Sequence, residues 1–303
     1  MADRQRVLAL GFFDGVHMGH GELLKKTTQV AKMLKATPAV LTFDTHPEDL
    51  IVGTPMPLIN SRRDREYIVK KYYGIEEVLL MHFDQACMHM PWQDFVENMV
   101  VRDCDAVHVV AGHDFRFGYK GIGNPQRLED KCFELGIGCD IIPCVEYDGT
   151  RISSTYIRKL IAQGDIERAN ILLGHPHTLS GEVIHGRQLG RTMGIPTVNM
   201  YLAAGVLSPC HGGYAARVHI GKKEYMGVTN VGVRPTVDGD ESTRVSVETH
   251  ILDYSGDLYG QVLRVDFYKF LRPEIHFRSI EDLKSEIHRN IRQTREFFSG
   301  YED

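Results

Sequence analysis

The chain lacks the features by which several classes of protein are recognised. None of its six cysteines forms a CxxC pair, and their spacing fits neither a zinc site nor a disulfide framework, so we interpret them as reduced thiols. No apolar run approaches the roughly 18 residues that a membrane-spanning helix needs. The N-terminal sequence MADRQRVLAL has no apolar core of a signal peptide before Asp14. Together these absences predict a cytoplasmic protein that binds no membrane.

An excess of basic residues is also missing. The formal net charge of −5 gives no support for non-specific binding to nucleic acid, although it leaves room for a local basic site that binds a small phosphorylated ligand. The chain contains no helix-turn-helix sequence and no GxxxxGK[ST] Walker loop. Its 43% hydrophobic and 25% charged residues are ordinary for a globular protein. Its 303 residues favour two domains, because single cores rarely grow beyond about 250–300 residues.

The first half of the chain alternates short apolar segments with segments of helical periodicity. This alternation predicts a doubly wound parallel α/β sheet. The expected strands are Val7–Phe13, Ala39–Phe43, Glu77–Phe83, Ala106–Gly112 and Cys139–Pro143. The expected helices are Glu22–Lys35, Trp92–Val101 and Pro125–Leu135.

After about Gly174 the chain becomes rich in glycine and alternates with period two, which predicts antiparallel strands in a small barrel. The clearest expected strands are Tyr214–Ile220, Arg244–Leu252 and Gln261–Phe267. A helix is expected over Ser279–Phe298, with a capping box at its start. Its apolar stripe would consist of Ile280, Leu283, Ile287 and Ile291. The helical connector Ile166–His177 places the boundary between domains 1–174 and 175–303.

Two histidines, His17 and His20, lie on either side of Gly19 where the first strand gives way to a helix. A glycine there lets the backbone approach a ligand closely, and a helix N-terminus offers free N–H groups and a partial positive charge that suit phosphate. Two imidazoles within one turn can then donate hydrogen bonds to phosphate oxygens and stabilise charge during phosphorus transfer. A metal site would need a third ligand that is not evident nearby. Two surface histidines in a polar turn are the remaining alternative.

Three sequence strings together resemble a known family. GFFDGVHMGH (Gly11–His20), GHDFRFGYKGIGN (Gly112–Asn124) and RISSTYIR (Arg151–Arg158) are similar to the signatures of the HxGH nucleotidyltransferases, and specifically of the prokaryotic bifunctional riboflavin kinase/FAD synthetases. The SST of the third string is by itself also typical of a helix N-cap. The resemblance implies a Rossmann-like nucleotidyltransferase domain followed by a six-stranded riboflavin kinase barrel with a C-terminal helix.

The resemblance also implies roles for residues of the first domain. The matching residues on the ATP side are Gly11, Phe13, Asp14, Gly15, His17, His20, Arg151, Ser154, Thr155 and Arg158. Those on the FMN side are Asp114, Phe115 and Asn124. His17 and His20 would act on the ATP phosphates, and the phosphate of FMN would be the nucleophile. Because that phosphate is ionised at neutral pH, positioning and charge stabilisation should carry the reaction without a general base.

The second candidate site lies in GRQLGRTMGIPTVNM, residues 186–200, which resembles the riboflavin kinase signature. Three glycines would let backbone amides face the ATP phosphates, and two arginines would add charge; these residues are Gly186, Arg187, Gly190, Arg191 and Gly194. Thr197 and Asn199 are oxygen donors two residues apart, so on a strand they point the same way and can share one Mg²⁺, with Thr197 also at the nucleotide. Taken alone, PTVN is also typical of a turn.

Two further strings, GVTNVGVRPT and VETHILDYSGDLYG, resemble the same kinase domain. By this resemblance Asn230, Arg234 and Glu248 lie at the flavin, and Glu248 is the general base that takes the proton from the riboflavin 5′-hydroxyl. A carboxylate on a strand is more often simply solvated, which is the alternative for Glu248. Asn290 and Thr294 stand where relatives commonly carry Asp and Ala, and we expect only local consequences.

The resemblance covers nearly the whole chain and implies a Mg²⁺-dependent enzyme of flavin cofactor biosynthesis. Riboflavin and ATP would give FMN and ADP, and FMN and ATP would then give FAD and pyrophosphate. The alternatives are a riboflavin kinase whose first domain is inactive or acts on a different phosphate, and a non-catalytic flavin-sensing regulator. The expected partners are small molecules only, with no nucleic acid and no membrane. The sequence leaves open a weak homo-oligomer.

Overall fold

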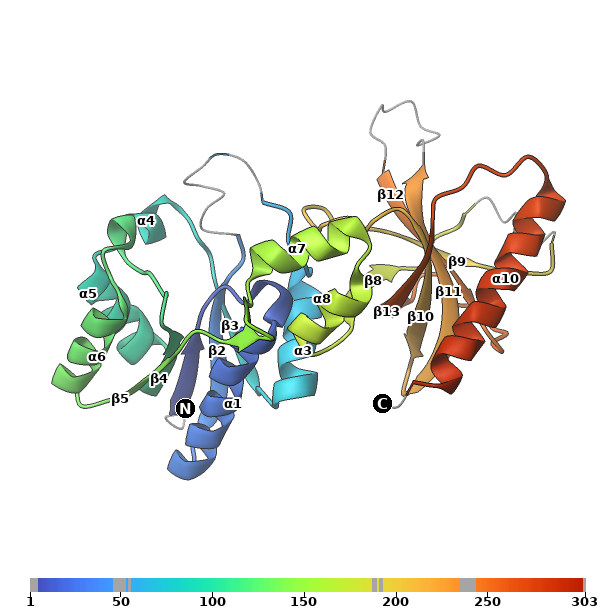
Figure 1. Ribbon diagram of the computed structural model, residues 1–303. Coiled ribbons are helices and arrows are strands. Elements are labelled where there is room, and N and C mark those ends of the chain that lie inside the picture. The colour runs from blue at the N-terminus through green and yellow to red at the C-terminus, as the bar shows by residue number, and fades with distance from the viewer. Residues whose placement is uncertain are drawn as a thin grey trace. The chain divides into compact units, whose positions relative to one another are not determined.

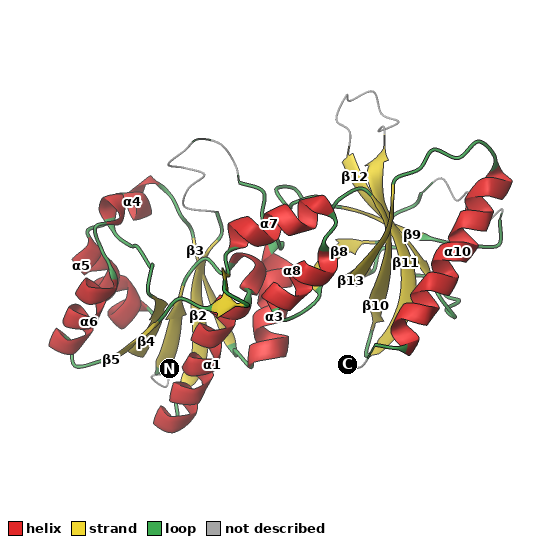
Figure 2. Cartoon of the chain, viewed as in Figure 1, coloured by secondary structure: helices red, strands yellow, loops and turns green. Residues whose placement is uncertain are grey.

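The computed structural model describes residues 5–45, 53, 56–186, 190, 193–234 and 244–301 (Figure 1). The chain divides into two compact units, each treated by itself below. The first comprises Met1–Pro57 with Arg65–Ser153, and the second comprises Leu58–Asp64 with Ser154–Asp303. Figure 2 shows that helices and strands alternate in the first unit, whereas strands dominate the second.

The first unit is a five-stranded parallel sheet with helices on both faces, as predicted for the first half of the chain. Its strands are β1 (Arg6–Leu10), β2 (Thr37–Phe43), β3 (Glu77–Met81), β4 (Ala106–Gly112) and β5 (Gly138–Ile142). Its helices are α1 (Met18–Leu34), α3 (Arg62–Tyr73, whose first turn belongs to the second unit), α4 (Gln85–Met88), α5 (Trp92–Asp94) and α6 (Pro125–Glu134). A two-stranded hairpin of β6 (Glu146–Tyr147) and β7 (Thr150–Arg151) follows.

The helix predicted over Trp92–Val101 is interrupted. Only α5 is α-helical, and the chain continues as a π-helix over Phe95–Asp103. The wider turn keeps Phe95, Val96, Met99 and Val100 buried against the sheet. Packing against the sheet therefore overrides the regular period that the sequence suggests.

Strand β1 lies at the centre of the sheet and is buried on both faces. Val7 and Ala9 belong to the core beneath α1 and α3, whereas Leu8 and Leu10 belong to the core beneath the π-helix and α6. The strand order is β3-β2-β1-β4-β5, so the direction of winding reverses beside β1. In such sheets the carboxyl ends of the strands at the reversal form the ligand-binding crevice.

The second unit is a six-stranded antiparallel barrel of order β8-β13-β10-β11-β12-β9, as the family resemblance implies. Its strands are β8 (His177–Glu182), β9 (Val198–Tyr201), β10 (Gly212–Ile220), β11 (Lys223–Arg234), β12 (Arg244–Ile251) and β13 (Val262–Pro273). Its helices are α7 (Ser154–Gln163), α8 (Ile166–Leu173) and α10 (Ile280–Ser299). Ile184, just past β8, donates its N–H to the carbonyl of Asn199 at 2.8 Å, so the two edges nearly close the barrel.

The C-terminal helix α10 begins as predicted, and Leu283 and Ile287 of the predicted stripe line the cavity against the strands. The hydroxyl of Ser279 accepts a hydrogen bond from the N–H of Asp282 at 3.0 Å and caps the helix. The predicted apolar stripe is wrong at Ile280, which is 54% exposed. The buried positions on α10 are the polar residues Asn290 and Thr294. Asn290 is buried because it binds Arg272 of β13, a contact that hydrophobic periodicity cannot reveal.

At the start of β8, the imidazole of His177 is fully buried against Phe267. Burial, with a smaller effect of His175, lowers the pKa of His177 to about 3. The ring is therefore neutral in the folded second unit at any pH near neutrality.

The second unit should accordingly lose stability as the pH falls from about 6.5 towards 3. In the unfolded chain His177 takes up a proton near the ordinary pKa of about 6.5, whereas the folded chain excludes it, so acid favours unfolding. Between about pH 6.5 and 5 the free energy of unfolding should fall by about 2 kcal/mol from this residue. Urea unfolding followed by far-ultraviolet circular dichroism should show this loss in the parent and not in His177→Gln. Equal losses in both proteins would contradict the assignment to His177.

Candidate active sites

The loop from β1 to α1 places both predicted histidines at the N-terminus of α1. His17 is the N-cap residue, and its Nδ1 accepts a hydrogen bond from the N–H of His20 at 3.3 Å. The two imidazoles stack with ring centroids 3.7 Å apart and planes 10° apart. A Cβ atom on Gly19 would lie 3.1 Å from the ring of His17, so the glycine makes room for that imidazole against the helix.

His20 is a neutral imidazole with an unused polar atom. Burial, then the neighbouring His17 and Arg65, lowers the pKa of His20 well below its usual value. Within the described part of the chain, the buried Nδ1 of His20 has no hydrogen-bond partner. A buried polar atom of this kind normally has a partner, so the geometry suits a ligand that supplies one. The free N–H groups at the N-terminus of α1 also favour an anionic ligand at this site.

Two other predicted residues of this loop, Phe13 and Asp14, have buried side chains. The side chain of Phe13 is 1% exposed and packs in the core, and Asp14 is 3% exposed. Phe13 has a φ of 58°, Gly15 of 78° and Val16 of 46°, so the backbone turns sharply through the left-handed region. Gly11 precedes this turn at the end of β1. For Phe13, only the backbone is left to meet a ligand.

The structure brings Asp114 and Arg151 together at the surface of the first unit. Arg151 Nη2 donates to Asp114 Oδ2 at 3.0 Å, and both side chains are more than half exposed. Phe115 packs in an aromatic cluster with Phe95 and Phe117. Asn124 has a structural task, because its Oδ1 accepts the N–H of Arg127 at 2.9 Å and caps α6.

The remaining predicted ATP-binding residues of the first site lie on another element. Ser154, Thr155 and Arg158 lie in the first turns of α7, which belongs to the second compact unit. Thr155 is exposed, whereas Ser154 and Arg158 are partly buried. The string RISSTYIR therefore crosses from one compact unit to the other between Ser153 and Ser154.

In the second unit, five of the predicted kinase residues line one cavity of about 250 Å³, whereas Gly186, Gly194 and Arg234 do not line it. Strand pairing sets Asn199 of β9 opposite Glu248 of β12, and Glu248 opposite Asn230 of β11. All three residues line the cavity, together with Thr197 and Gly190. The row therefore presents one carboxylate flanked by two amides on the cavity wall. Arg234, the last residue of β11, pairs with Arg244 at the end of the same ladder.

Thr197 and Asn199 present oxygen donors to the same cavity. Asn199 is 5% exposed, and its Nδ2 lies 3.5 Å from the carbonyl of Thr197. Its buried Oδ1 has no hydrogen-bond partner among the residues that the structure describes. An orphaned amide oxygen beside a hydroxyl suits a hard cation.

The glycine-rich segment before β9 approaches the same strand closely. A Cβ on Gly190 would lie 2.2 Å from the carbonyl oxygen of Ile195, and the N–H of Ile195 donates to the carbonyl of Gly190 at 2.8 Å. Only glycine fits in that turn. Gly186 lies beside the amide of Asn199, and Gly194 has a φ of 74°. The predicted Arg187 and Arg191 lie outside the described residues.

The cavity also contains polar residues that sequence reasoning did not assign. Arg272 donates from Nε to Asn290 Oδ1 at 3.1 Å and from Nη2 to Asn230 Oδ1 at 3.4 Å. Burial lowers the pKa of Arg272 below its usual value, although Glu286 lies 3.6 Å away. In the sequence, the only indication of this hydrogen-bond network was the polar Asn290 within the C-terminal helix. Asn290 itself lines the cavity.

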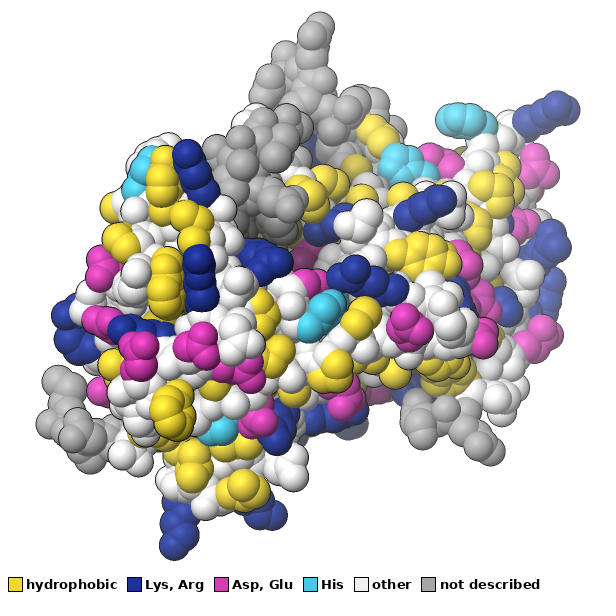
Figure 3. Space-filling view, turned by 60° about the vertical axis from the view of Figure 1, so that its left-hand side comes forward, with side chains coloured by type: hydrophobic (Ala, Val, Ile, Leu, Met, Phe, Trp, Pro, Cys, Tyr) yellow, Lys and Arg dark blue, Asp and Glu magenta, His cyan; other side chains and the backbone are white. Residues whose placement is uncertain are grey.

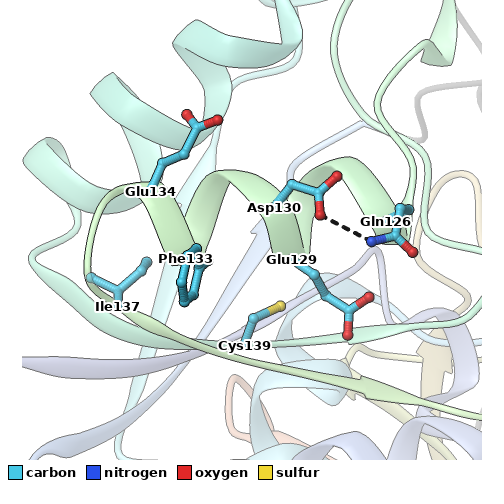
Figure 4. Close-up of a pocket in the computed structure, with 7 residues that line it drawn as sticks. All are labelled: Gln126, Glu129, Asp130, Phe133, Glu134, Ile137 and Cys139. Carbon is cyan, nitrogen blue, oxygen red and sulfur yellow. Dashed lines mark hydrogen bonds between the residues drawn. The ribbon is translucent and has the colours of Figure 1, made fainter.

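A larger hollow of about 570 Å³ lies along α6 and β5 of the first unit (Figure 4). It is lined by Gln126, Glu129, Asp130, Phe133, Glu134, Ile137 and Cys139. Phe133 is 87% exposed there, and Gln126 donates to Asp130 at 3.0 Å. None of the residues predicted for either site lines this hollow.

Histidines at a helix N-terminus in the first unit and a carboxylate on the cavity of the second unit suit an enzyme that transfers phosphorus-containing groups. Two family models match the chain: FAD synthetase over residues 1–156 and riboflavin kinase over residues 173–298. The chain belongs to the family of bifunctional riboflavin kinase/FMN adenylyltransferases. These matches agree with the resemblance drawn from the sequence strings alone.

Curated relatives of that name match along nearly the whole chain. The relative from Listeria monocytogenes is 35% identical and covers 99% of this chain and 95% of its own length. The relative from Haemophilus influenzae is 36% identical over 97% of this chain and 94% of its own length. The relative from Escherichia coli is 36% identical over 96% of this chain and 92% of its own length.

A solved structure from Streptococcus pneumoniae also matches, with a TM-score of 0.81 and 30% identity over 96% of this chain and 94% of that one. That protein is named a macrolide-efflux protein. The family assignment of the present chain rests on the enzyme relatives that match along nearly its whole length. Across the described ranges, no helix has both the length and the apolar character needed to cross a membrane.

Replacing Gly19 by Ala should separate stability from the function of the histidine loop. Alanine is favoured over glycine in helix interiors by up to about 1 kcal/mol. Gly19 lies in the first turn, however, where the contact with His17 offsets that gain, so we expect the stability of the first unit to change by less than about 1 kcal/mol. The added Cβ would displace the ring of His17 by a few tenths of an ångström, and FAD formation from FMN should fall on the order of tenfold.

The fluorescence of Trp92, in the first unit, measures the stability of that unit during urea unfolding. Gly300→Ala is the matched control, because a Cβ there meets no atom within 4 Å. A Gly19→Ala protein with parental FAD formation would show that the position of the His17 ring is not critical.

Proposed function

We propose that this chain phosphorylates riboflavin in the cavity between the barrel strands and α10, and adenylylates the resulting FMN at the histidine loop. The observation that carries the proposal is the row of Asn199, Glu248 and Asn230 across three paired strands on one cavity wall. The stacked His17 and His20 at the N-terminus of α1 support the second reaction. An acidic centre and a helix-terminus anion site meet the different needs of the two nucleophiles.

In the kinase reaction the nucleophile is a hydroxyl, which is weak until a base accepts its proton. We assign that base to Glu248, because it lies on the cavity between two amides that can orient a flavin and a phosphate. The 5′-oxygen of riboflavin attacks the γ-phosphorus of ATP, its proton passes to Glu248, and the bond to ADP breaks. Asn230 and Arg234 are assigned to the flavin side.

The residues at the start of β9 fit Mg²⁺. The orphaned Oδ1 of Asn199 and the hydroxyl of Thr197 are hard oxygen donors facing the cavity, and we assign both as ligands. The described residues contain no group of three or more His, Cys, Asp or Glu side chains arranged to hold a metal ion. An ion bound by two neutral ligands would therefore be shared with ATP, and it would neutralise charge on the phosphate oxygens. Gly186, Gly190, Gly194, Arg187 and Arg191 are assigned to the nucleotide.

In the adenylylation the nucleophile is the FMN phosphate, which is already ionised. One of its oxygens attacks the α-phosphorus of ATP, and the bond to pyrophosphate breaks. The neutral His20 can donate one N–H to a phosphate oxygen, and the N-terminus of α1 adds partial positive charge. Arg151, Ser154, Thr155 and Arg158 are assigned to the triphosphate, and Asp114, Phe115 and Asn124 to the FMN side.

We place the functional boundary between residues 174 and 175. Helix α8 ends at Leu173, Gly174 follows with a φ of 76°, and the kinase family match begins at residue 173. We further propose a cytoplasmic enzyme whose partners are small molecules, with neither nucleic acid nor membrane among them. Positive and negative side chains are interspersed on the face shown in Figure 3, as suits that proposal.

The double substitution His17→Ala with His20→Ala should abolish FAD formation while FMN formation persists. The physical reason is that both rings lie in the first unit, whereas the row around Glu248 lies in the second. The parent and the variant are incubated with riboflavin, ATP and Mg²⁺, and the flavins are separated by chromatography. A parent that makes neither FMN nor FAD overturns the proposed function. A folded variant that makes FAD, or that loses FMN formation, contradicts the assignment of the histidines.

Glu248→Gln should lower riboflavin phosphorylation by about 10²–10⁴-fold, because the amide keeps the shape but accepts no proton at neutral pH. FAD formation from supplied FMN should stay near the parental rate. Thr197→Ala and Asn199→Ala should also lose kinase activity, and raised Mg²⁺ should partly restore these two variants and not Glu248→Gln. Phosphorylation within a few-fold of the parent in Glu248→Gln would show that this carboxylate is not the base.

A further inference from the structure

We propose that Arg65 is a positioning residue of the adenylyltransferase site, which clamps the carbonyl of Phe12 and thereby holds the loop that presents His17 and His20. The proposal rests on the role assigned above to the two histidines. Arg65 belongs to α3 and has no place in any of the sequence strings that point to the family. It acts through the loop and not through contact with the reacting atoms.

The clamp is a set of contacts around one backbone carbonyl. Arg65 Nη1 donates to the carbonyl of Phe12 at 2.7 Å, and the hydroxyl of Thr42, near the end of β2, donates to the same oxygen at 2.9 Å. The guanidinium carbon also lies 4.4 Å from the centroid of the Phe12 ring. Arg65 is only 5% exposed. A buried planar cation thus contacts both the backbone and the side chain of Phe12, and a flexible ammonium group lacks the planar, pre-organised geometry of this contact.

The loop needs such support because its backbone is strained. Phe13 has a φ of 58°, and Val16, a β-branched residue, has a φ of 46°. Non-glycine residues rarely adopt this region, and they persist there only where surrounding contacts hold them. Phe12 directly precedes the strained stretch. Fixing its carbonyl from α3 and β2 therefore fixes where the turn begins.

The strained turn connects the clamped Phe12 to the two histidines, so the position of Phe12 affects theirs. The ring of Phe13 lies edge-on to His20, with centroids 5.2 Å apart and planes 63° apart. His17, at the end of the turn, caps α1 and stacks on His20. A displaced Phe12 would therefore move the two imidazoles that the reaction needs in place.

The charge of Arg65 has a second effect on the same site. The charged and titratable groups that act on His20 are His17, on its own helix, and Arg65, from α3, and both lower the pKa of His20. A cation held behind the loop thus disfavours a proton on His20 without neutralising the positive end of α1. Loss of Arg65 should raise the pKa of His20 towards its usual value, and this readout separates the proposal from a purely structural role.

The test uses the full-length protein and three single variants. Arg65→Gln removes the charge, Arg65→Lys keeps it but loses the planar contact, and Arg63→Gln removes an exposed arginine from the same helix as the matched control. For each, kcat and KM of FAD formation are measured with FMN, ATP and Mg²⁺. Riboflavin phosphorylation is the internal control. Nuclear magnetic resonance of ¹⁵N-labelled histidines gives the pKa of His20.

We expect kcat for FAD formation to fall on the order of 10²-fold in Arg65→Gln and less in Arg65→Lys, since a displacement of about 1 Å at a site can have that effect. Arg63→Gln should match the parent, and riboflavin phosphorylation should stay within about twofold throughout. The pKa of His20 should rise in Arg65→Gln. A folded Arg65→Gln protein with parental kcat and parental His20 titration overturns the proposal. Should that variant not fold, an Arg65→Lys protein with parental kcat overturns the proposal equally, since this variant keeps the charge and loses only the planar contact.

A double-mutant cycle with His20→Ala separates this proposal from the proposed function. If Arg65 acts through the histidine loop, Arg65→Gln should cause a smaller fold-loss of kcat in the His20→Ala protein than in the parent, because only His17 is then left to be displaced. Independent, multiplicative losses would overturn the proposed route while leaving the role of His20 intact. Parental FAD formation by His20→Ala itself would overturn the role of His20, and with it the premise of the clamp.

Discussion

The burial of β1 between β2 and β4 is the constraint on which the first site depends. Its residues pair on both sides with parallel neighbours, and Val7 to Leu10 are at most 2% exposed. The strand can neither slip nor tilt without opening two cores at once. The chain must therefore leave the sheet at Leu10, at the edge where the winding reverses, and turn at once into α1. That turn sets the helix N-terminus and its histidines at the crevice.

The second unit must activate a hydroxyl nucleophile, and it provides a carboxylate on paired strands for this purpose. Antiparallel pairing places Asn199, Glu248 and Asn230 in one row, on the strand face opposite the buried Val247 and Thr249. On that face the row lines a cavity whose other wall includes Leu283, Ile287 and Asn290 of α10. A hydroxyl nucleophile needs a proton acceptor, and the row contains one. A phosphate nucleophile needs only donors and positive potential, which a helix N-terminus and imidazoles supply. The residue types at the two sites follow the two nucleophiles.

Much of the fold could be predicted because buried parallel strands and alternating antiparallel strands leave clear patterns in the sequence. The errors occur where one contact outweighs the pattern. The first strand ends at Leu10 and not at Phe13, because Phe13 turns into the left-handed region. On α10, Ile280 of the predicted stripe is exposed, whereas the polar Asn290 is buried in contact with Arg272. Such contacts join residues far apart in the chain, and local periodicity does not register them.

The sequence by itself determined the two-part organisation, the position of the histidines at a strand-to-helix turn, and the string that places Glu248 on a strand. These are properties of short segments, and short segments carry their own periodicity and turn chemistry. Only the tertiary structure decided which side chains meet: Arg65 on the carbonyl of Phe12, Arg151 on Asp114, and Glu248 between two amides. Each meeting depends on the packing of whole elements against one another, because burial of apolar surface, and not any local preference, sets which strands and helices become neighbours.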